Sequence, residues 1–318
     1  MRVSGYTGKD DLATVYVADL GEGRLAEFVE SVQPPVPREK KWVLIVSTLC
    51  GCPVSCSMCD AGSFYGGKLS KEEISAQIDF LVEQRYPDRS VPVEKFKVQF
   101  ARMGEPSFNP AVLEVLEELP VRYDAPGLMP CLSTVAPVGT KEFFEQLLEI
   151  KRELFTRRFQ LQFSIHTTDE AVRDRLIPVN KWDLGGIARY GERFFEIGDR
   201  KVALNFALAE DVPLDPVKLT RYFDPEVFLI KITPVNPTFA ARSSRLVSRI
   251  EPSAVRYESP LIGRLRACGY EVIVSIGQAR ENEIGSNCGQ YVMSHLREEA
   301  EIDSSYTHAV KDYQAASE

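Results

Sequence analysis

From residue 41 onward, short apolar segments alternate along the chain with longer amphipathic ones. The apolar segments are typical of buried strands, and the amphipathic ones of helices that cover a sheet. We expect strands at residues 42–48, 96–100, 128–135, 159–166, 202–208, 228–232 and 271–276. Helices are expected at residues 71–84, 111–119 and 140–154. Ser70 and Glu73 have the spacing of a capping box at the start of the first helix.

The strand expected at residues 159–166 alternates most clearly between apolar and polar side chains. Its apolar face carries Phe159, Leu161, Phe163 and Ile165, and its polar face carries Gln160, Gln162, Ser164 and His166. Helices cover the outside of a parallel barrel, so the polar face points inward. A closed eight-stranded barrel has an apolar interior. The pattern therefore predicts an α/β fold with an open, partial (β/α)6 barrel of TIM-like type that holds a polar ligand.

The two ends of the chain differ in character from this central region. Residues 1–40 contain an expected strand pair, at 13–18 and 25–32, and a proline-rich linker at 34–37. Glycines at 21 and 23 favour a turn within the pair. We therefore expect a short N-terminal β extension at 1–40, the barrel at 41–296 and an acidic, polar tail at 297–318.

Composition narrows the setting in which the protein acts. The chain has 318 residues, 44% of them hydrophobic, and no segment approaches the roughly 20 apolar residues of a membrane span. Seven cysteines, an odd number, and an N-terminus without an apolar signal segment favour the reducing cytoplasm. The net charge of −8 and the absence of a dense basic run disfavour DNA and large RNA as partners.

The most informative motif is the CxxxCxxC spacing of Cys52, Cys56 and Cys59, which follows the first strand of the barrel. Structural zinc sites and ferredoxin clusters use four protein ligands. Three thiolates leave one iron of a [4Fe–4S] cluster open. Enzymes of the radical S-adenosylmethionine (SAM) type use such a cluster: the open iron chelates SAM, and an electron releases a 5′-deoxyadenosyl radical. Further motifs fall at the carboxyl ends of the expected strands, where sites in such folds lie.

Taken together, these motifs resemble the radical SAM rRNA adenine methyltransferases of the RlmN/Cfr type, from about residue 13 to 296. The matching stretches are Cys52–Cys59, Met103-Gly104-Glu105-Pro106 with Asn109, Leu132–Thr134, Ser164–His166, Ile177–Lys181, Pro234–Pro237, Arg242–Ser244 and Cys288–Gln290. The cysteine spacing is common to all radical SAM enzymes. The Asn-Pro, Arg-Ser-Ser and Cys-Gly-Gln elements are more specific to this branch.

The resemblance implies a role for each matching position. Cys52, Cys56 and Cys59 would bind the cluster. SAM would be held by Gly104, Glu105, Ser133, Ser164, His166 and Asn236. Cys288 would accept a methyl group from one SAM, and the radical from a second SAM would activate that methyl group for addition to an sp2 carbon. An electron donor such as flavodoxin or ferredoxin is implied, and no membrane.

Three departures from the family pattern bear on the substrate. The family's second cysteine, which resolves the protein–substrate adduct, corresponds to Ile45, and Cys50 and Cys131 are candidates to replace it. Met58 stands where an aromatic residue is usual. The family's helical RNA-recognition domain has no counterpart here. We therefore expect a small molecule, a nucleotide or a short RNA as substrate.

Other interpretations of these residues stay open at this point. The three cysteines could form a zinc knuckle in an interaction protein without catalytic chemistry. His166 could be a satisfied inward polar side chain, and Cys288 and Cys268 could be structural thiols. Among enzymatic alternatives, the radical could abstract hydrogen directly from the substrate and drive a rearrangement or an oxidation without methyl transfer.

Overall fold

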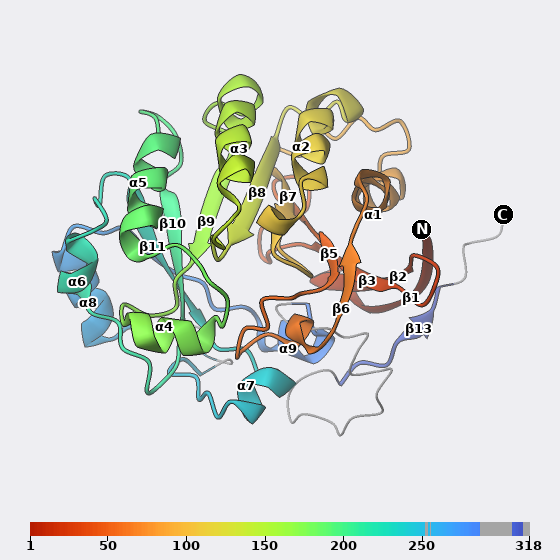
Figure 1. Ribbon diagram of the computed structural model, residues 1–318. Helices are drawn as coiled ribbons and strands as arrows, with labels where there is room; N and C mark the ends of the chain where they lie inside the picture. Colours follow the sequence, from red (N-terminus) through yellow and green to blue (C-terminus); the bar gives the residue numbers. More distant parts are fainter. Residues whose placement is uncertain (252–253, 255, 287–306, 314–318) are drawn as a thin grey trace.

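A computed structural model describes residues 1–251, 254, 256–286 and 307–313, and its centre is one large, curved sheet (Figure 1). The sheet has eleven strands in the order β12-β11-β10-β9-β8-β7-β4-β3-β2-β1-β13. From β12 to β4 all neighbours pair in parallel, and from β4 to β13 all pair antiparallel. The order does not close on itself among the described strands. The expected open barrel is therefore confirmed.

The parallel strands lie close to their expected positions. They are β4 (Trp42–Val46), β7 (Phe96–Phe100), β8 (Leu128–Thr134), β9 (Gln160–Ser164), β10 (Val202–Leu208), β11 (Phe228–Pro234) and β12 (Val272–Val274). Helices on their outer face include α1 (Lys71–Glu83), α2 (Ala111–Arg122), α3 (Lys141–Leu154), α5 (Leu184–Phe194), α6 (Pro216–Thr220) and α8 (Pro260–Ala267). Ser70 and Glu73 form the capping box expected at the start of α1.

The N-terminal segment extends the barrel sheet. It contains β1 (Arg2–Lys9), β2 (Ala13–Asp19) and β3 (Leu25–Ser31), and β3 pairs with β4. The sequence predicted β2 and β3 but not β1, because Gly5 and Thr7 occupy two of its inward positions and give little hydrophobic signal. Within the expected tail, β13 (Lys311–Asp312) pairs with β1. The proposed domain limits themselves stay a prediction.

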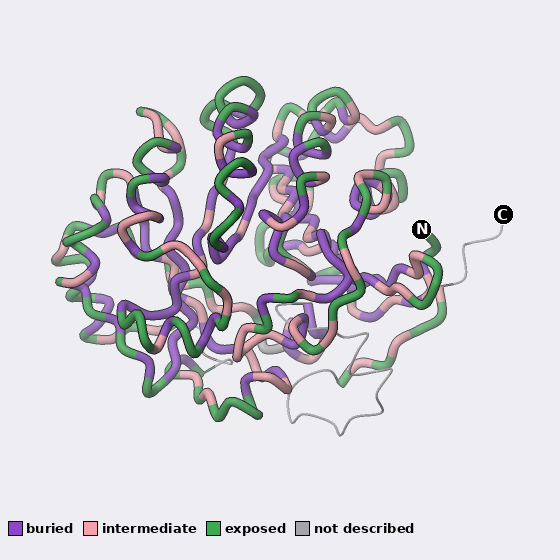
Figure 2. Tube along the Cα trace, in the orientation of Figure 1, coloured by how far each residue is buried: buried purple, intermediate pink, exposed green. Residues whose placement is uncertain are grey.

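Along β7, β9 and part of β11, buried residues alternate with less buried ones, whereas β10 is buried throughout (Figure 2). Along β7 and β11, side chains such as Phe96, Val98, Ile230 and Ile232 are buried in the core beneath the helices. The alternate positions on the inner face are polar and only partly buried: Lys97, Gln99, Gln162, Ser164, Lys231 and Thr233. These polar side chains line the inside of the open barrel, here called the lumen, as the alternation at residues 159–166 predicted. Apolar side chains such as Ile45 and Met129 share this inner face.

Two helices, α4 (Glu170–Leu176) and α7 (Phe239–Ser243), lie at the carboxyl edge of the parallel strands (Figure 1). A third helix, α9 (Ala279–Ile284), lies against β2. Among the described residues, no helix combines the length and apolar character that crossing a bilayer requires.

Candidate functional site

A two-stranded hairpin closes the loop that carries the three motif cysteines. The strands β5 (Leu49–Gly51) and β6 (Tyr65–Lys68) pair antiparallel on either side of residues 52–64. The Cys52 amide donates to the Phe64 carbonyl at 3.2 Å. Gly51 has a φ of +77°, and a Cβ placed there would lie 2.0 Å from the Phe64 oxygen. Only glycine therefore allows the hairpin to close at this point.

The base of this loop is fastened to the loop that follows β7. The amides of Thr48 and Leu49 donate to the Met103 carbonyl at 2.8 and 3.2 Å. The Asn109 side-chain amide donates to the carbonyls of Thr48 and Leu69, at 2.8 and 2.7 Å. Gly104 has a φ of +105°, and a Cβ there would lie 2.6 Å from the Leu49 side chain. These contacts bring two of the family motifs together.

Glu105 lies beneath this junction, at 3% exposure. Its carboxylate accepts hydrogen bonds from Ser107, from the Thr134 hydroxyl and from the Val135 amide at 2.8 Å. Burial raises the pKa of this carboxyl, and the hydrogen bonds oppose that effect. Glu105 therefore connects the loop after β7 to the end of β8. A contact between Glu105 and SAM stays a prediction.

The opposite side of the cysteine loop is held by α4 and α7. The Ser57 amide donates to the Leu176 carbonyl at 2.9 Å. The Thr238 hydroxyl donates to the Met58 carbonyl at 3.0 Å, and Asp60 accepts from the Ala240 amide at 2.8 Å. Asn236 belongs to this same segment after β11, since its carbonyl accepts from the Thr238 amide. The structure thus brings the cysteine loop, Gly104, Glu105 and Asn236 to one edge of the barrel.

The environment of Cys52 fits a cluster-bound thiolate. Its thiol accepts hydrogen bonds from the backbone amides of Val54, Ser55 and Glu105, while burial raises its pKa to about 11. Binding to iron removes the thiol proton outright, and amide donors to sulfur are a means by which proteins tune such clusters. Cys52 and Cys56 also pack against apolar side chains at the strand ends, among them Val135 and Val235.

The number of cysteine ligands is what distinguishes a cluster from a zinc site here. Structural zinc sites use four protein ligands, whereas the three thiolates of this loop leave one iron of a [4Fe–4S] cluster open. Within the described ranges, no three His, Cys, Asp or Glu side chains are grouped closely enough to hold one metal ion. The zinc knuckle stays an alternative.

Ser133 and Ser164 lie on the lumen face of β8 and β9, both partly buried. The Ser133 hydroxyl accepts from the Gln162 side-chain amide at 3.1 Å, and the Gln162 carbonyl accepts from the Lys231 ammonium at 3.1 Å. The sequence predicted Ser133 and Ser164 but missed Lys231. The alternation of lysine with isoleucine along residues 228–234 was the available signal.

His166 is held within the protein at 8% exposure. Its Nδ1 accepts from the Ala207 amide at 3.2 Å. Burial, together with the nearby Arg173 guanidinium, lowers its pKa to about 4, so the imidazole is neutral at pH 7. This geometry agrees with a satisfied inward polar side chain. A contact between His166 and SAM stays a prediction.

Cys288, the expected methyl carrier, lies outside the described residues. The chain leading to it is held by Arg102, whose guanidinium donates to the carbonyls of Gly285 and Ser286 at 2.8 and 3.0 Å. Arg102 also forms a buried ion pair with Glu27. Sequence reasoning missed Arg102, although it directly precedes the Met103-Gly104-Glu105 motif.

The two cysteines proposed to replace the family's second cysteine lie in different places. Cys131 is on the lumen face of β8, where Gln99 lies between it and Ile45 in the sheet register. Cys50 is in the β5 strand, and its thiol donates to the Leu25 carbonyl at 3.1 Å. Only Cys131 therefore shares the inner face of the sheet with Ile45.

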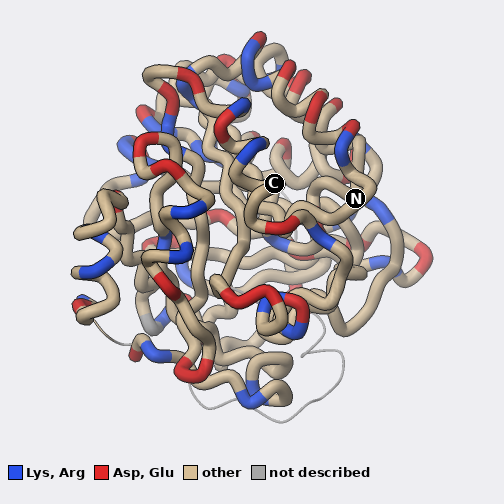
Figure 3. Tube along the Cα trace, turned by 60° about the vertical axis from the view of Figure 1, so that its left-hand side comes forward, with Lys and Arg blue, Asp and Glu red and all other residues tan. Residues whose placement is uncertain are grey.

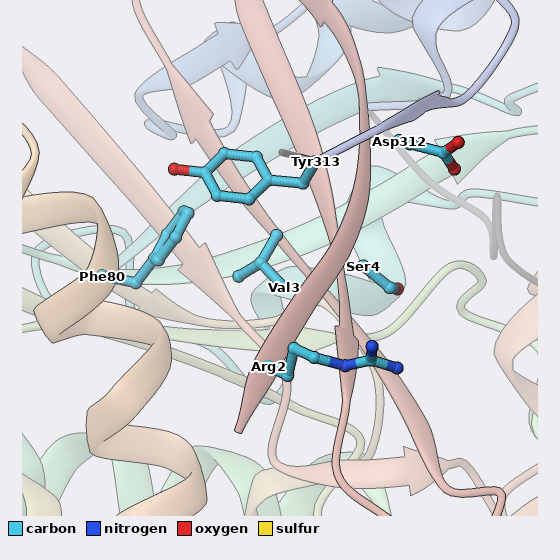
Figure 4. Close-up of a pocket in the computed structure, with 6 residues that line it drawn as sticks. All are labelled: Arg2, Val3, Ser4, Phe80, Asp312 and Tyr313. Carbon is cyan, nitrogen blue, oxygen red and sulfur yellow. The ribbon is translucent and has the colours of Figure 1, made fainter. Parts of the chain in front are cut away.

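One surface hollow adjoins this site, and another lies away from it at the N-terminal strands. One is lined by Pro53, Tyr65, Lys68, Phe108 and Val179 and adjoins the cysteine loop. The other lies between β1, β13 and α1 and is lined by Arg2, Val3, Ser4, Phe80, Asp312 and Tyr313 (Figure 4). Basic and acidic positions are interspersed along the trace (Figure 3), as the sequence indicated.

The chain is similar in sequence to RNA-modifying enzymes. It is 27% identical over 279 residues to "Probable dual-specificity RNA methyltransferase RlmN" of Thermobifida fusca, covering 84% of this chain and 71% of that protein. The protein of the same name from Rhodococcus opacus is 27% identical over 302 residues, covering 89% and 74%. No family model matches the chain.

The fold is similar to that of a solved radical SAM methyltransferase from Sphaerobacter thermophilus. The TM-score is 0.67 at 21% identity, over 86% of this chain and 76% of that one. The similarities in sequence and fold confirm the predicted resemblance and fold class. They also support a radical SAM methyltransferase function, with SAM and a [4Fe–4S] cluster as cofactors. The individual site residues stay predictions.

Proposed function

We propose that this chain methylates an sp2 carbon of a nucleotide or RNA by radical SAM chemistry, with Cys288 as the methyl carrier. One observation carries the proposal. The CxxxCxxC loop is hydrogen-bonded both to the Met103-Gly104-Glu105 loop and to the segment around Asn236. A ligand bound to that loop would therefore lie at the carboxyl ends of the parallel strands, where sites in such folds are found.

Cys52, Cys56 and Cys59 would hold the cluster, and the amides around Cys52 favour its thiolate. When bound and reduced, the cluster supplies the electron that cleaves SAM. Gly104 allows the loop after β7 to pack closely against Leu49, because a Cβ at position 104 would collide with the Leu49 side chain. Ser133, Ser164 and Asn236 present hydroxyl and amide groups at the strand ends, which suits the carboxylate and ribose of SAM.

The methyl carrier explains how an unreactive carbon could be modified. An aromatic carbon beside ring nitrogens is a poor nucleophile, so it cannot attack the methyl group of SAM directly. A methyl group held on the Cys288 sulfur would instead lose a hydrogen atom to the 5′-deoxyadenosyl radical and add to that carbon. Arg102 supports this role, because it fixes the backbone two residues before Cys288.

Once the adduct had lost a proton and returned one electron to the cluster, a second thiol would have to form a disulfide with the Cys288 sulfur, which breaks the sulfur–carbon bond. Cys131 is the candidate for that thiol, because it shares the inner face of the sheet with Ile45.

The proposal also requires an electron donor and a reducing compartment. A flavodoxin or ferredoxin would supply the electron, and the cytoplasm would preserve the cluster. Pro53 and Ser55, in the cysteine loop, are exposed to solvent. A small redox protein could therefore approach the cluster closely.

The proposal is tested by anaerobic reconstitution of the full chain with iron and sulfide. We expect a bound cluster by iron analysis and visible absorption, and formation of 5′-deoxyadenosine after addition of SAM and a reductant. Cys52→Ala should lose both. Cys268→Ala, at the end of α8 and away from the loop, is the matched control. Full iron content in Cys52→Ala would overturn the cluster assignment.

A further inference from the structure

The lumen contains positive charge that nothing in the described structure neutralises. Lys97 on β7 and Lys231 on β11 both point into the lumen. The residues directly before and after each lysine are buried in the core beneath the helices, and successive side chains of a strand point to opposite faces. Among the described residues, neither lysine forms an ion pair. Lys231 donates only to the neutral side chain of Gln162. In a chain of net charge −8, two inward lysines without carboxylates are unusual.

The two lysines lie on separate strands of the barrel and interact electrostatically across the lumen. β8, β9 and β10 separate their strands in the sheet, yet Lys97 acts electrostatically on Lys231. Burial, and then Lys97, lowers the pKa of Lys231 to about 8. The Cys131 thiol lies beside Lys97, and its own pKa is raised by burial, so it supplies no negative charge at neutral pH. Without a ligand, Lys97 and Lys231 therefore repel each other, and Lys41 adds to the repulsion because it interacts with both.

A second observation points to a ligand at the same place. Asn205 on β10 is paired in register with both Ser164 on β9 and Lys231 on β11. Asn205 is 9% exposed, and its Oδ1 has no hydrogen-bond partner in the described structure. A buried polar atom without a partner is costly, and a ligand that donates to it would remove the cost.

We propose that the lumen binds the phosphate monoester of a small substrate between Lys97 and Lys231, with Asn205 accepting from a hydroxyl or amino group of the same molecule. This inference rests on the proposed function and names its substrate class. A phosphate monoester carries about −1.5 to −2 charges at pH 7, which matches two ammonium groups. An internal phosphodiester or a carboxylate carries a single charge. A mononucleotide provides both the dianion and the hydroxyl donors.

Binding can be measured without the cluster, by equilibrium dialysis of the full chain against labelled adenosine 5′-monophosphate. We expect saturable binding of this probe, and binding weaker by roughly tenfold or more for adenosine and for the diester adenylyl-adenosine. Lys231→Met and Lys97→Met should each weaken binding of the monophosphate by a similar factor. Lys9→Met removes an exposed lysine of β1 and should leave it unchanged. Circular dichroism checks that each variant is folded.

Two results would overturn the inference. Equal binding of adenosine, the diester and the monophosphate would show that the lysines do not select a dianion. Competitive displacement of the monophosphate by SAM, with SAM binding itself weakened by Lys231→Met, would assign the lysines to the SAM carboxylate. A chain that binds the monophosphate but no cluster would keep this site and refute the proposed radical chemistry. The two proposals therefore fail separately.

Discussion

Glu105 and His166 are two buried titratable side chains at the carboxyl edge of the strands. Several hydrogen-bond donors surround the Glu105 carboxyl, whereas burial and a nearby cation keep the His166 imidazole neutral. The Glu105 carboxylate receives several hydrogen bonds, which offset part of the cost of its burial. His166 is kept neutral by burial and by Arg173, and its Nδ1 needs a lone pair to accept from Ala207. Protonation of His166 would remove that acceptor and place a cation in the interior.

His166 should therefore make the fold sensitive to acid. Its pKa is about 4 in the folded chain and about 6.5 when unfolded. Between these values the unfolded state binds the extra proton, so the free energy of unfolding falls as the pH drops from about 6.5 to 4, by about 3 kcal/mol. The His166→Asn side chain does not titrate, and its Oδ1 can still accept a hydrogen bond from the Ala207 amide. In this variant the acid-dependent fall in the free energy of unfolding should therefore be smaller by the contribution of His166. Urea unfolding of the cluster-free chain at about pH 6.5 and pH 4 measures the free energy of unfolding for both proteins. If that free energy falls equally with pH in the unsubstituted chain and in His166→Asn, His166 is not the group responsible.

At the scale of elements, the short hairpin of β5 and β6 determines the shape of the cysteine loop. Sequence patterns did not predict it, because strands of three and four residues carry too little periodicity. The expected strand at 42–48 instead ends at Val46. Sites in parallel α/β folds lie at the carboxyl ends of the strands, and this rule depends only on strand order and direction. It therefore predicted from the sequence that the cysteines, Gly104 and Asn236 lie at one edge of the sheet, as they do.

Two glycines of this hairpin provide a matched pair of variants. Gly51 and Gly67 both have positive φ, +77° and +99°. A Cβ at Gly51 would collide with the Phe64 oxygen, whereas nothing lies within 4 Å of a Cβ at Gly67. We expect Gly51→Ala to lose most of its iron after reconstitution and Gly67→Ala to keep most of it. Equal iron contents, measured by metal analysis, would show that hairpin closure is not required for cluster binding.

Arg102 connects the Gly104 loop with the chain that leads to Cys288. In Arg102→Lys the charge opposite Glu27 is kept, but a single ammonium replaces the planar guanidinium that reaches two carbonyls. We expect SAM cleavage to continue while methylation of Cys288 falls roughly tenfold, because only positioning is lost. Arg280→Lys, on the surface of α9 and paired with Asp11, is the control. Normal methylation of the Arg102→Lys peptide, seen by mass spectrometry, would refute the positioning role.

At the scale of the whole molecule, the N-terminal strands make one sheet with the barrel. The order of strands and helices followed from local periodicity, and so did the polar inner face at residues 159–166. Local periodicity did not predict the contacts between residues that are distant in sequence. Glu27 with Arg102, Asp60 with α7, and Lys97 with Lys231 are brought together only by strand pairing and barrel curvature. A single lysine within β7 and another within β11 do not by themselves predict that the two side chains line the same lumen.

Radical chemistry on a methyl group carried by Cys288 distinguishes the proposed methyltransferase from an enzyme that abstracts hydrogen directly from its substrate. The most direct measurement uses SAM with a deuterated methyl group, reduced enzyme and adenosine 5′-monophosphate as trial substrate. We expect deuterium on the Cys288 peptide and then in 5′-deoxyadenosine, because the radical abstracts a deuterium atom from the carried methyl group. 5′-Deoxyadenosine formed without deuterium, together with an unmodified Cys288 peptide, would contradict it and favour direct hydrogen abstraction from the substrate.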